Sequence, residues 1–197
     1  MHASWNSDRI RNIGIFLHFL ATCGRIGIPK FCGNSENSAE CFINAKRLLG
    51  KESGKMAYSA LEVAKYVINH EHNEDRPITN LRLQKLLYFV QAKILVETGE
   101  PCFEDEMQAW EYGPVVPIVY EAYKKYGNLP IIEEQQITEK IKASIQNNIG
   151  KILNYFGSTP TFELVQITHN QTPWIEAKKK GLRTKIETDA IRRFFVS

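Results

Sequence analysis

Among the residues that could do chemistry, His169 has the most suggestive neighbours: Thr168 and Asn170 flank it, and Trp174 follows five positions later. A histidine in such a setting could serve as a general base. However, no serine or cysteine lies in a recognisable activating motif, and Cys102 simply follows a proline. We therefore predict no catalytic residues and a structural role for His169, which would hydrogen-bond the end of a helix or pack on Trp174.

Two polar clusters resemble metal sites only superficially. His70 and His72 are two positions apart, whereas helical side chains that share a ligand are three or four apart. Glu104, Asp105 and Glu106 are consecutive and lack the glycine and regular spacing of a calcium loop. We expect solvated histidines and an acidic loop that is solvated or faces a basic partner. No phosphate-binding loop, dinucleotide fingerprint or metalloprotease motif is present, so we expect neither metal nor cofactor.

Gln84 and Gln91 are seven residues apart and fall between two apolar arcs of a predicted helix. A buried amide needs hydrogen-bond partners, because leaving one unpaired costs about 1–3 kcal/mol. Two interpretations stay open. The glutamines bond the strand predicted at residues 110–112 or a nearby turn, or they face a groove that a partner completes.

Aromatic residues between positions 110 and 126 could likewise either pack within the protein or face a partner. Most buried aromatics belong to cores, but Tyr and Trp also dominate the hot spots of protein interfaces. Tyr123 and Tyr126 stand beside Lys124 and Lys125. We therefore predict that these two tyrosines are exposed.

A helix over about residues 80–98 must position the glutamines. Thr79 can cap its first turn, and Gly99 followed by Pro101 ends it. Hydrophobic residues cover more than half of its circumference, which is typical of a helix at the centre of a domain. The charged residues expected on the opposite side are Arg82, Lys85, Lys93 and Glu97.

Residues 108–112 alternate in type and predict a short strand. Gly113-Pro114 then predicts a sharp turn, and Pro117 fits the first turn of another helix. The other helices are expected to begin at Ser59 (a capping box with Glu62), Thr138, Thr159-Pro160, Pro173-Trp174 and Thr188 or Asp189. The predicted fold is mainly α with a small β element, in a single compact domain around the central helix.

The formal net charge of +3 is divided unevenly. Residues 1–55 carry +4, residues 56–173 carry −5 and residues 174–197 carry +4. A nucleic-acid-binding domain normally shows a basic face, so the acidic central region argues against nucleic acid as the main partner. No apolar stretch is long enough to span a bilayer, and no membrane partner is expected.

Three motifs in order carry a resemblance to a known family: LQKLLYFVQ from residue 83, AWEYGPVVP-x-VYE-x-YKKYG from residue 109 and ELVQITHNQTPW-x-EA from residue 163. Together they resemble the Panacea domain, also called the SocA-like antitoxin or phage-associated GepA-like domain, over about residues 56–197. An isolated YGP would be weak evidence, whereas three ordered motifs are specific. The third motif contains the residues expected to be structural, Thr168, His169, Pro173 and Trp174.

The resemblance implies a cytoplasmic antitoxin without enzyme activity, which binds a cognate protein toxin encoded in the adjacent gene. The alternatives are an adaptor that delivers a toxin to a AAA+ protease, a DNA-binding autoregulator, and an enzyme that uses His169. The residues expected to bind the partner are Trp110, Tyr112, Gly113, Pro114, Tyr120, Tyr123 and Lys124, with Gln84 and Gln91.

Residues 1–55 show no sustained periodicity and hold Cys23, Cys32 and Cys41. The apolar run at 13–22 superficially resembles a secretory signal, and the cysteines lack the close C-x₂-C pair of a zinc site. Met56 is where the domain of this family normally begins. We predict that residues 1–55 are an atypical extension, either translated upstream sequence or a disordered segment, before the domain at 56–197.

Overall fold

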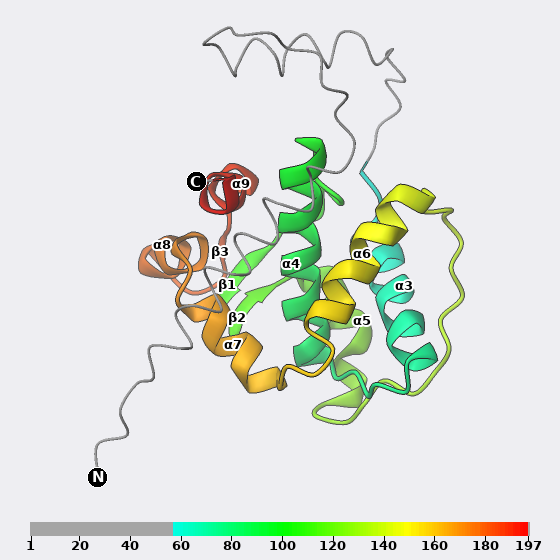
Figure 1. Cartoon of the computed structure of the whole chain (residues 1–197). Helices are drawn as coiled ribbons and strands as arrows, with labels where there is room; N and C mark the ends of the chain where they lie inside the picture. Colours follow the sequence, from blue (N-terminus) through cyan, green and yellow to red (C-terminus); the bar gives the residue numbers. More distant parts are fainter. Residues whose placement is uncertain (1–56, 197) are drawn as a thin grey trace, which may run out of the picture.

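The computed structural model describes residues 57–196 of the chain (Figure 1). The predicted extension, with its cysteines and its apolar run, lies outside this range. The described residues confirm a mainly α fold with a small β element. Its elements are α3 (Ala60–Asn73), α4 (Asn80–Thr98), β1 (Gln108–Trp110), β2 (Gly113–Val115), α5 (Pro117–Tyr123), the 3-10 helix η2 (Lys124–Tyr126), α6 (Ala143–Tyr155), α7 (Thr161–His169), α8 (Thr172–Lys180), β3 (Thr184–Lys185) and α9 (Thr188–Val196).

Helix α4 is the centre of the domain, as predicted. In Figure 1 it lies between α3 and α6 on one side and the sheet with α7, α8 and α9 on the other. Thr79 Oγ1 accepts a hydrogen bond of 3.3 Å from the Arg82 amide at its start. At its end Gly99 takes a left-handed conformation with φ 75°, and its amide donates to Leu95 O. The predicted cap and stop are therefore both confirmed.

The charged side of α4 differs from the prediction, because Arg82, Lys85 and Lys93 are all buried. Elements distant in sequence cover that side, where Arg82 and Lys85 find acceptors, whereas Lys93 pairs with Glu97 of α4 itself. The Arg82 guanidinium donates to Thr159 O at 2.6 Å and to Phe156 O at 2.8 Å. Lys93 Nζ lies 2.6 Å from the carboxylate of Glu97, which is only half-buried.

Helix α3 begins at the predicted cap, but not with the predicted capping box. Ser59 Oγ accepts from the Leu61 amide at 3.3 Å. The Glu62 carboxylate instead accepts from the amides of Thr138 at 2.7 Å and Glu139 at 3.0 Å. Burial disfavours its charged form, but these bonds and one from Lys65 outweigh that effect and lower the pKa of Glu62 to about 2. Thr138 is thus engaged by α3, and α6 begins later than predicted, at Ala143.

The β element is a three-stranded antiparallel sheet in the order β2-β1-β3. Trp110 pairs with Gly113, so Glu111 and Tyr112 form the hairpin turn. The prediction of a turn at Gly113-Pro114 is therefore wrong, since both residues belong to β2. Pro114 is tolerated because β2 is an edge strand, where a missing amide hydrogen costs no ladder bond.

The remaining helices follow the predicted starts. Helix α7 has Pro160 as its N-cap residue, and α8 carries a proline in its first turn. None of the helices within residues 57–196 is long and apolar enough to cross a membrane.

Candidate protein-binding site

The hairpin rests on α4 through Lys85. This side chain is fully buried, and its Nζ donates to Pro114 O at 2.6 Å. Gly113 lies directly above it with φ +102°, and a Cβ there would come within 2.8 Å of Lys85 Nζ and 2.7 Å of Thr168 Oγ1. Only glycine meets both constraints. Residues of all three sequence motifs therefore meet at this contact between α4, β2 and α7.

Burial removes water from the ammonium group of Lys85 and lowers its pKa to about 7. The helical pattern of α4 predicts an outward position for this lysine, so its buried role differs from the prediction. No signal within its own helix reveals this role, because the groups that cover Lys85 belong to β2 and α7.

Gln84 and Gln91 are buried and hydrogen-bonded within the protein, as in the first of the two interpretations, although neither bonds residues 110–112. Gln84 Oε1 accepts from the Val116 amide at 2.8 Å, and its Nε2 donates to Asn80 Oδ1 at 3.0 Å. Gln91 Oε1 accepts from the Cys102 amide at 2.9 Å. Both glutamines therefore fix the connections that follow α4. Gly113 and Pro114 are likewise buried, so we leave these four residues out of the surface assigned to a partner below, and their binding of one stays a prediction.

The outer side of the hairpin carries a layer of aromatic and cationic side chains. The Trp110 ring lies 4.8 Å from the Tyr120 ring of α5, centroid to centroid, and the Arg183 guanidinium lies 5.0 Å from the Trp110 centroid. Trp110 Nε1 donates to Gln108 Oε1 at 2.9 Å. Trp110 and Tyr120 are half-buried. A partner that binds here would meet rings already held in place.

Two further large hydrophobic side chains, one in the hairpin turn and one on α5, are open to solvent. Tyr112 at the hairpin turn is 61% exposed and Ile118 on α5 is 47% exposed. Lys124 is also exposed and pairs with Glu121 one turn earlier. We call the set of Trp110, Tyr112, Ile118, Tyr120 and Lys124 the hairpin face.

Tyr123 does not belong to this face, and the prediction that it is exposed is wrong. It is 6% exposed, its hydroxyl donates to Gln135 Oε1 at 2.9 Å, and its ring stacks on Tyr126 at 6.5 Å. Burial raises its pKa to about 12, with smaller contributions from Tyr126, Glu62 and Glu133. The segment after η2 folds back over α5 and covers it. Tyr126 is half-buried.

His169 packs on Trp174, which is one of the two arrangements predicted for it. Its ring stacks on Trp174 with 4.0 Å between centroids and 12° between planes. Trp174 Nε1 donates to Trp110 O at 3.1 Å. Lys178 Nζ lies 4.7 Å from the centroid of the Trp174 ring. Thr168 Oγ1 donates to Val165 O within α7. Burial lowers the pKa of His169, and the nearby charges of Lys178 and Lys85 lower it further.

The other candidates for chemistry do not form a reactive site. Cys102 is buried, and burial raises the pKa of its thiol to about 12, which leaves no thiolate for attack near neutral pH. Asp105 caps α3 by accepting from the Ala60 amide at 2.7 Å, while Glu104 and Glu106 are exposed as expected. Within residues 57–196 no three His, Cys, Asp or Glu side chains converge as metal ligands would.

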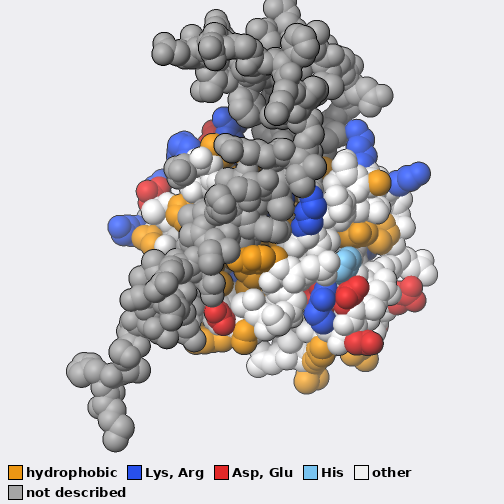
Figure 2. Space-filling model, in the orientation of Figure 1, with side chains coloured by type: hydrophobic (Ala, Val, Ile, Leu, Met, Phe, Trp, Pro, Cys, Tyr) orange, Lys and Arg blue, Asp and Glu red, His pale blue; other side chains and the backbone are white. Residues whose placement is uncertain are grey.

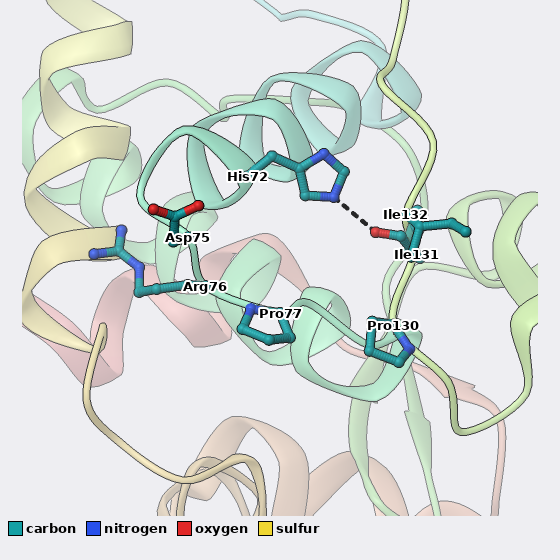
Figure 3. A pocket seen from close by; sticks show the side chains of 7 residues that line it. All are labelled: His72, Asp75, Arg76, Pro77, Pro130, Ile131 and Ile132. Carbon is teal, nitrogen blue, oxygen red and sulfur yellow. Dashed lines mark hydrogen bonds between the residues drawn. The ribbon is translucent and has the colours of Figure 1, made fainter.

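A second surface feature, which the sequence analysis missed, is an open hollow of about 410 Å³ at the end of α3. Its lining residues are His72, Asp75, Arg76, Pro77, Pro130, Ile131 and Ile132. Figure 3 shows the end of α3 on one side and the segment from Pro130 to Ile132 on the other. A hydrogen bond of 2.7 Å between His72 Nε2 and Ile131 O joins the two sides. His72 is therefore not the solvated residue that was predicted. We call this feature the α3 hollow.

The chain is similar to known proteins over the region of the three motifs that meet at Lys85. Residues 83–175 match the family described as "Antitoxin SocA-like, Panacea domain". The protein named "Antitoxin SocA" from Caulobacter vibrioides (strain NA1000 / CB15N) is 32% identical over 128 residues, which cover 58% of this chain and 68% of that protein. No solved structure gave a significant match.

The matched region runs from the first turn of α4 into α8, so it contains the whole hairpin, α5, α6 and α7. These are the elements of an antitoxin domain. The chain belongs to the SocA-like antitoxin family, whose domain is called Panacea.

Proposed function

We propose that this protein is the antitoxin of a toxin–antitoxin pair and neutralises its cognate protein toxin by binding it directly. The observation that carries the proposal is the similarity to Antitoxin SocA across most of that protein's length. A toxin encoded in the adjacent gene is the expected partner, and the pair would act in the cytoplasm.

The hairpin face is the surface that we assign to toxin binding. Tyr and Trp are the residue types that most often anchor protein interfaces. Trp110 is held between Arg183 and Tyr120, so its ring would lose little conformational entropy on binding. Tyr112 and Ile118 supply exposed apolar area beside it.

Binding of protein is favoured over catalysis and over binding of DNA. His169 is stacked on Trp174, and a ring fixed in this way is poorly placed to move protons for a substrate. Two basic residues of the C-terminal segment have acidic partners: Lys178 of α8 lies 3.5 Å from Glu111, and Lys185 of β3 lies 2.9 Å from Glu187. Such pairing weakens the positive field that DNA binding requires.

The test uses the product of the neighbouring gene. We expect it to arrest growth when expressed alone and to be silenced by co-expression with this chain. Tyr112→Ala and Lys124→Glu should each weaken binding by at least about tenfold, as hot-spot substitutions do. Phe162→Ser is the matched control, because Phe162 is 65% exposed and lies on α7, which contributes no residue to the hairpin face.

Two results would count against the proposal. A neighbouring product that is harmless, or that this chain neither binds nor silences, would contradict the function. If binding occurs but neither hairpin-face variant changes it, the function stands and the toxin binds another surface.

A further inference from the structure

The α3 hollow has apolar walls that are held open. Ile132 is 79% exposed and Leu129, just before the hollow, is 70% exposed, the two highest values among the large hydrophobic residues described. Their segment is fixed in an extended conformation, because the Ile131 amide donates to Ile78 O at 2.8 Å and Pro130 bridges to Thr79. Ile131 points into the core and is 1% exposed. Ile132 is therefore kept at the surface.

Asp75 lines the α3 hollow, and three further acidic residues lie within two positions of lining residues in the sequence. Glu74, Asp75, Glu133 and Glu134 are all exposed. At the lower edge of Figure 2, hydrophobic side chains lie beside acidic ones. Asp75 and Glu134 have no ion pair among the described residues, whereas Glu133 lies 3.2 Å from Lys125. An occupant with a positive charge would find the unpaired carboxylate of Asp75 in the lining and that of Glu134 two residues beyond Ile132.

The one cationic residue among those that line the hollow, Arg76, already pairs with acidic residues of the protein. The Arg76 guanidinium donates to the buried Glu71 carboxylate at 2.7 Å and lies 3.6 Å from Glu74. His72 is likewise bound to Ile131 O. Because these polar groups are occupied, the walls favour aliphatic contacts and the acidic residues favour a cation. The volume of about 410 Å³ lies near the lower end of ligand pockets, and its open form suits side chains of a segment laid across it.

From these contacts we propose that the α3 hollow is a second protein-binding site, which takes an extended peptide segment with Lys or Arg between branched aliphatic residues. Aliphatic side chains of the segment cover Ile132 and Pro130, and the cation lies against Asp75 and Glu134. The site is separate from the hairpin face. It does not depend on the antitoxin function, because its test requires no toxin.

The probe is the synthetic peptide acetyl-Leu-Arg-Ile-Lys-Leu-amide, titrated into the isotope-labelled full chain and followed by amide NMR. We expect a dissociation constant below about 1 mM, with the shifts concentrated at residues 72–77 and 129–134. Acetyl-Leu-Glu-Ile-Glu-Leu-amide and acetyl-Ser-Arg-Ser-Lys-Ser-amide should each bind about tenfold more weakly, since one lacks the cations and the other the aliphatic groups. Added salt should weaken the first peptide further.

Single variants locate the site. Ile132→Ser and Asp75→Asn should each weaken binding about fivefold without changing the melting temperature, because both side chains are exposed and Asn tolerates the positive φ of 51° at position 75. The control is Leu182→Ser, which alters a side chain that is 58% exposed on the far side of the molecule, between α8 and β3. Peptide shifts outside the hollow, equal binding of the acidic peptide, or an equal effect of Leu182→Ser would each overturn the proposal.

Discussion

The inner and outer sides of the hairpin and of α5 constrain their residues in opposite ways. On the inner side, Gly113 and Pro114 pack on Lys85, and Val116 is tied to Gln84. On the outer side, Tyr112 is 61% exposed although it is the residue next to Gly113. Side chains on the inner side are therefore constrained by direct contacts, whereas an exposed side chain on the outer side can be replaced without a clash.

The difference teaches that a family motif mixes two kinds of residue. Gly113 is required because a Cβ would collide with Thr168 and Lys85. Tyr112 meets no such requirement within the described structure and is free to serve a partner. Within the one run of residues 109–127, buried structural residues therefore alternate with exposed residues to which we assign toxin binding. Substitutions on the two sides should separate them.

The largest effect is expected deep on the inner side. Leu87 is fully buried on α4, and Leu87→Asp would place a carboxylate in the core at a cost of about 4–5 kcal/mol or more. Because domains of this size are stable by about 5–15 kcal/mol, we expect the variant to be largely unfolded by circular dichroism. A soluble variant with a native-like melting transition would show that α4 is not the centre of the core.

Gly113→Ala tests the contact between β2 and α4. The added methyl group meets Thr168 and Lys85, and the positive φ strains the backbone, so we expect a loss of about 2–4 kcal/mol in urea unfolding. Gly127→Ala is the control, because Gly127 also has a positive φ but a Cβ there meets nothing within 4 Å. Equal losses in the two variants would mean that strain alone, and not the close approach, requires glycine at 113.

The pH dependence of stability tests the state of Lys85. Its pKa is about 7 in the folded protein and about 10.4 when unfolded. Between these values the unfolded chain binds more protons, so stability rises with pH across this window. Relative to Lys85→Met, the wild type should gain about 2 kcal/mol from pH 7 to pH 9. Parallel stability curves for the two proteins would show that burial does not shift this lysine.

The smallest effect on stability is expected on the outer side. Tyr112→Ala should change the free energy of unfolding by less than about 0.5 kcal/mol, because its side chain is mostly in solvent. Differential scanning calorimetry of this variant and the wild type checks the prediction. A loss of about 2 kcal/mol would place Tyr112 among the structural residues and remove it from the hairpin face.

The sequence by itself determined the local structure wherever a short-range signal acts. Thr79 and Gly99 set the ends of α4 through caps that involve neighbours within four positions. The stacking of His169 on Trp174 could be predicted for the same reason, since the two lie five positions apart on consecutive helices. The central position of α4 could also be predicted, because hydrophobic residues recur around most of its circumference at helical spacing.

Only the tertiary structure decided the roles of the polar and aromatic residues. Lys85 looks like an exposed charge until β2, far along the chain, brings Pro114 O within 2.6 Å of it. Tyr123 looks exposed beside two lysines until the segment that carries Gln135 folds over it. Ile132 looks like a core residue, yet its neighbours hold it at the surface, 79% exposed. Burial of these side chains depends on which distant segment covers them, and periodicity within one helix carries no information about that.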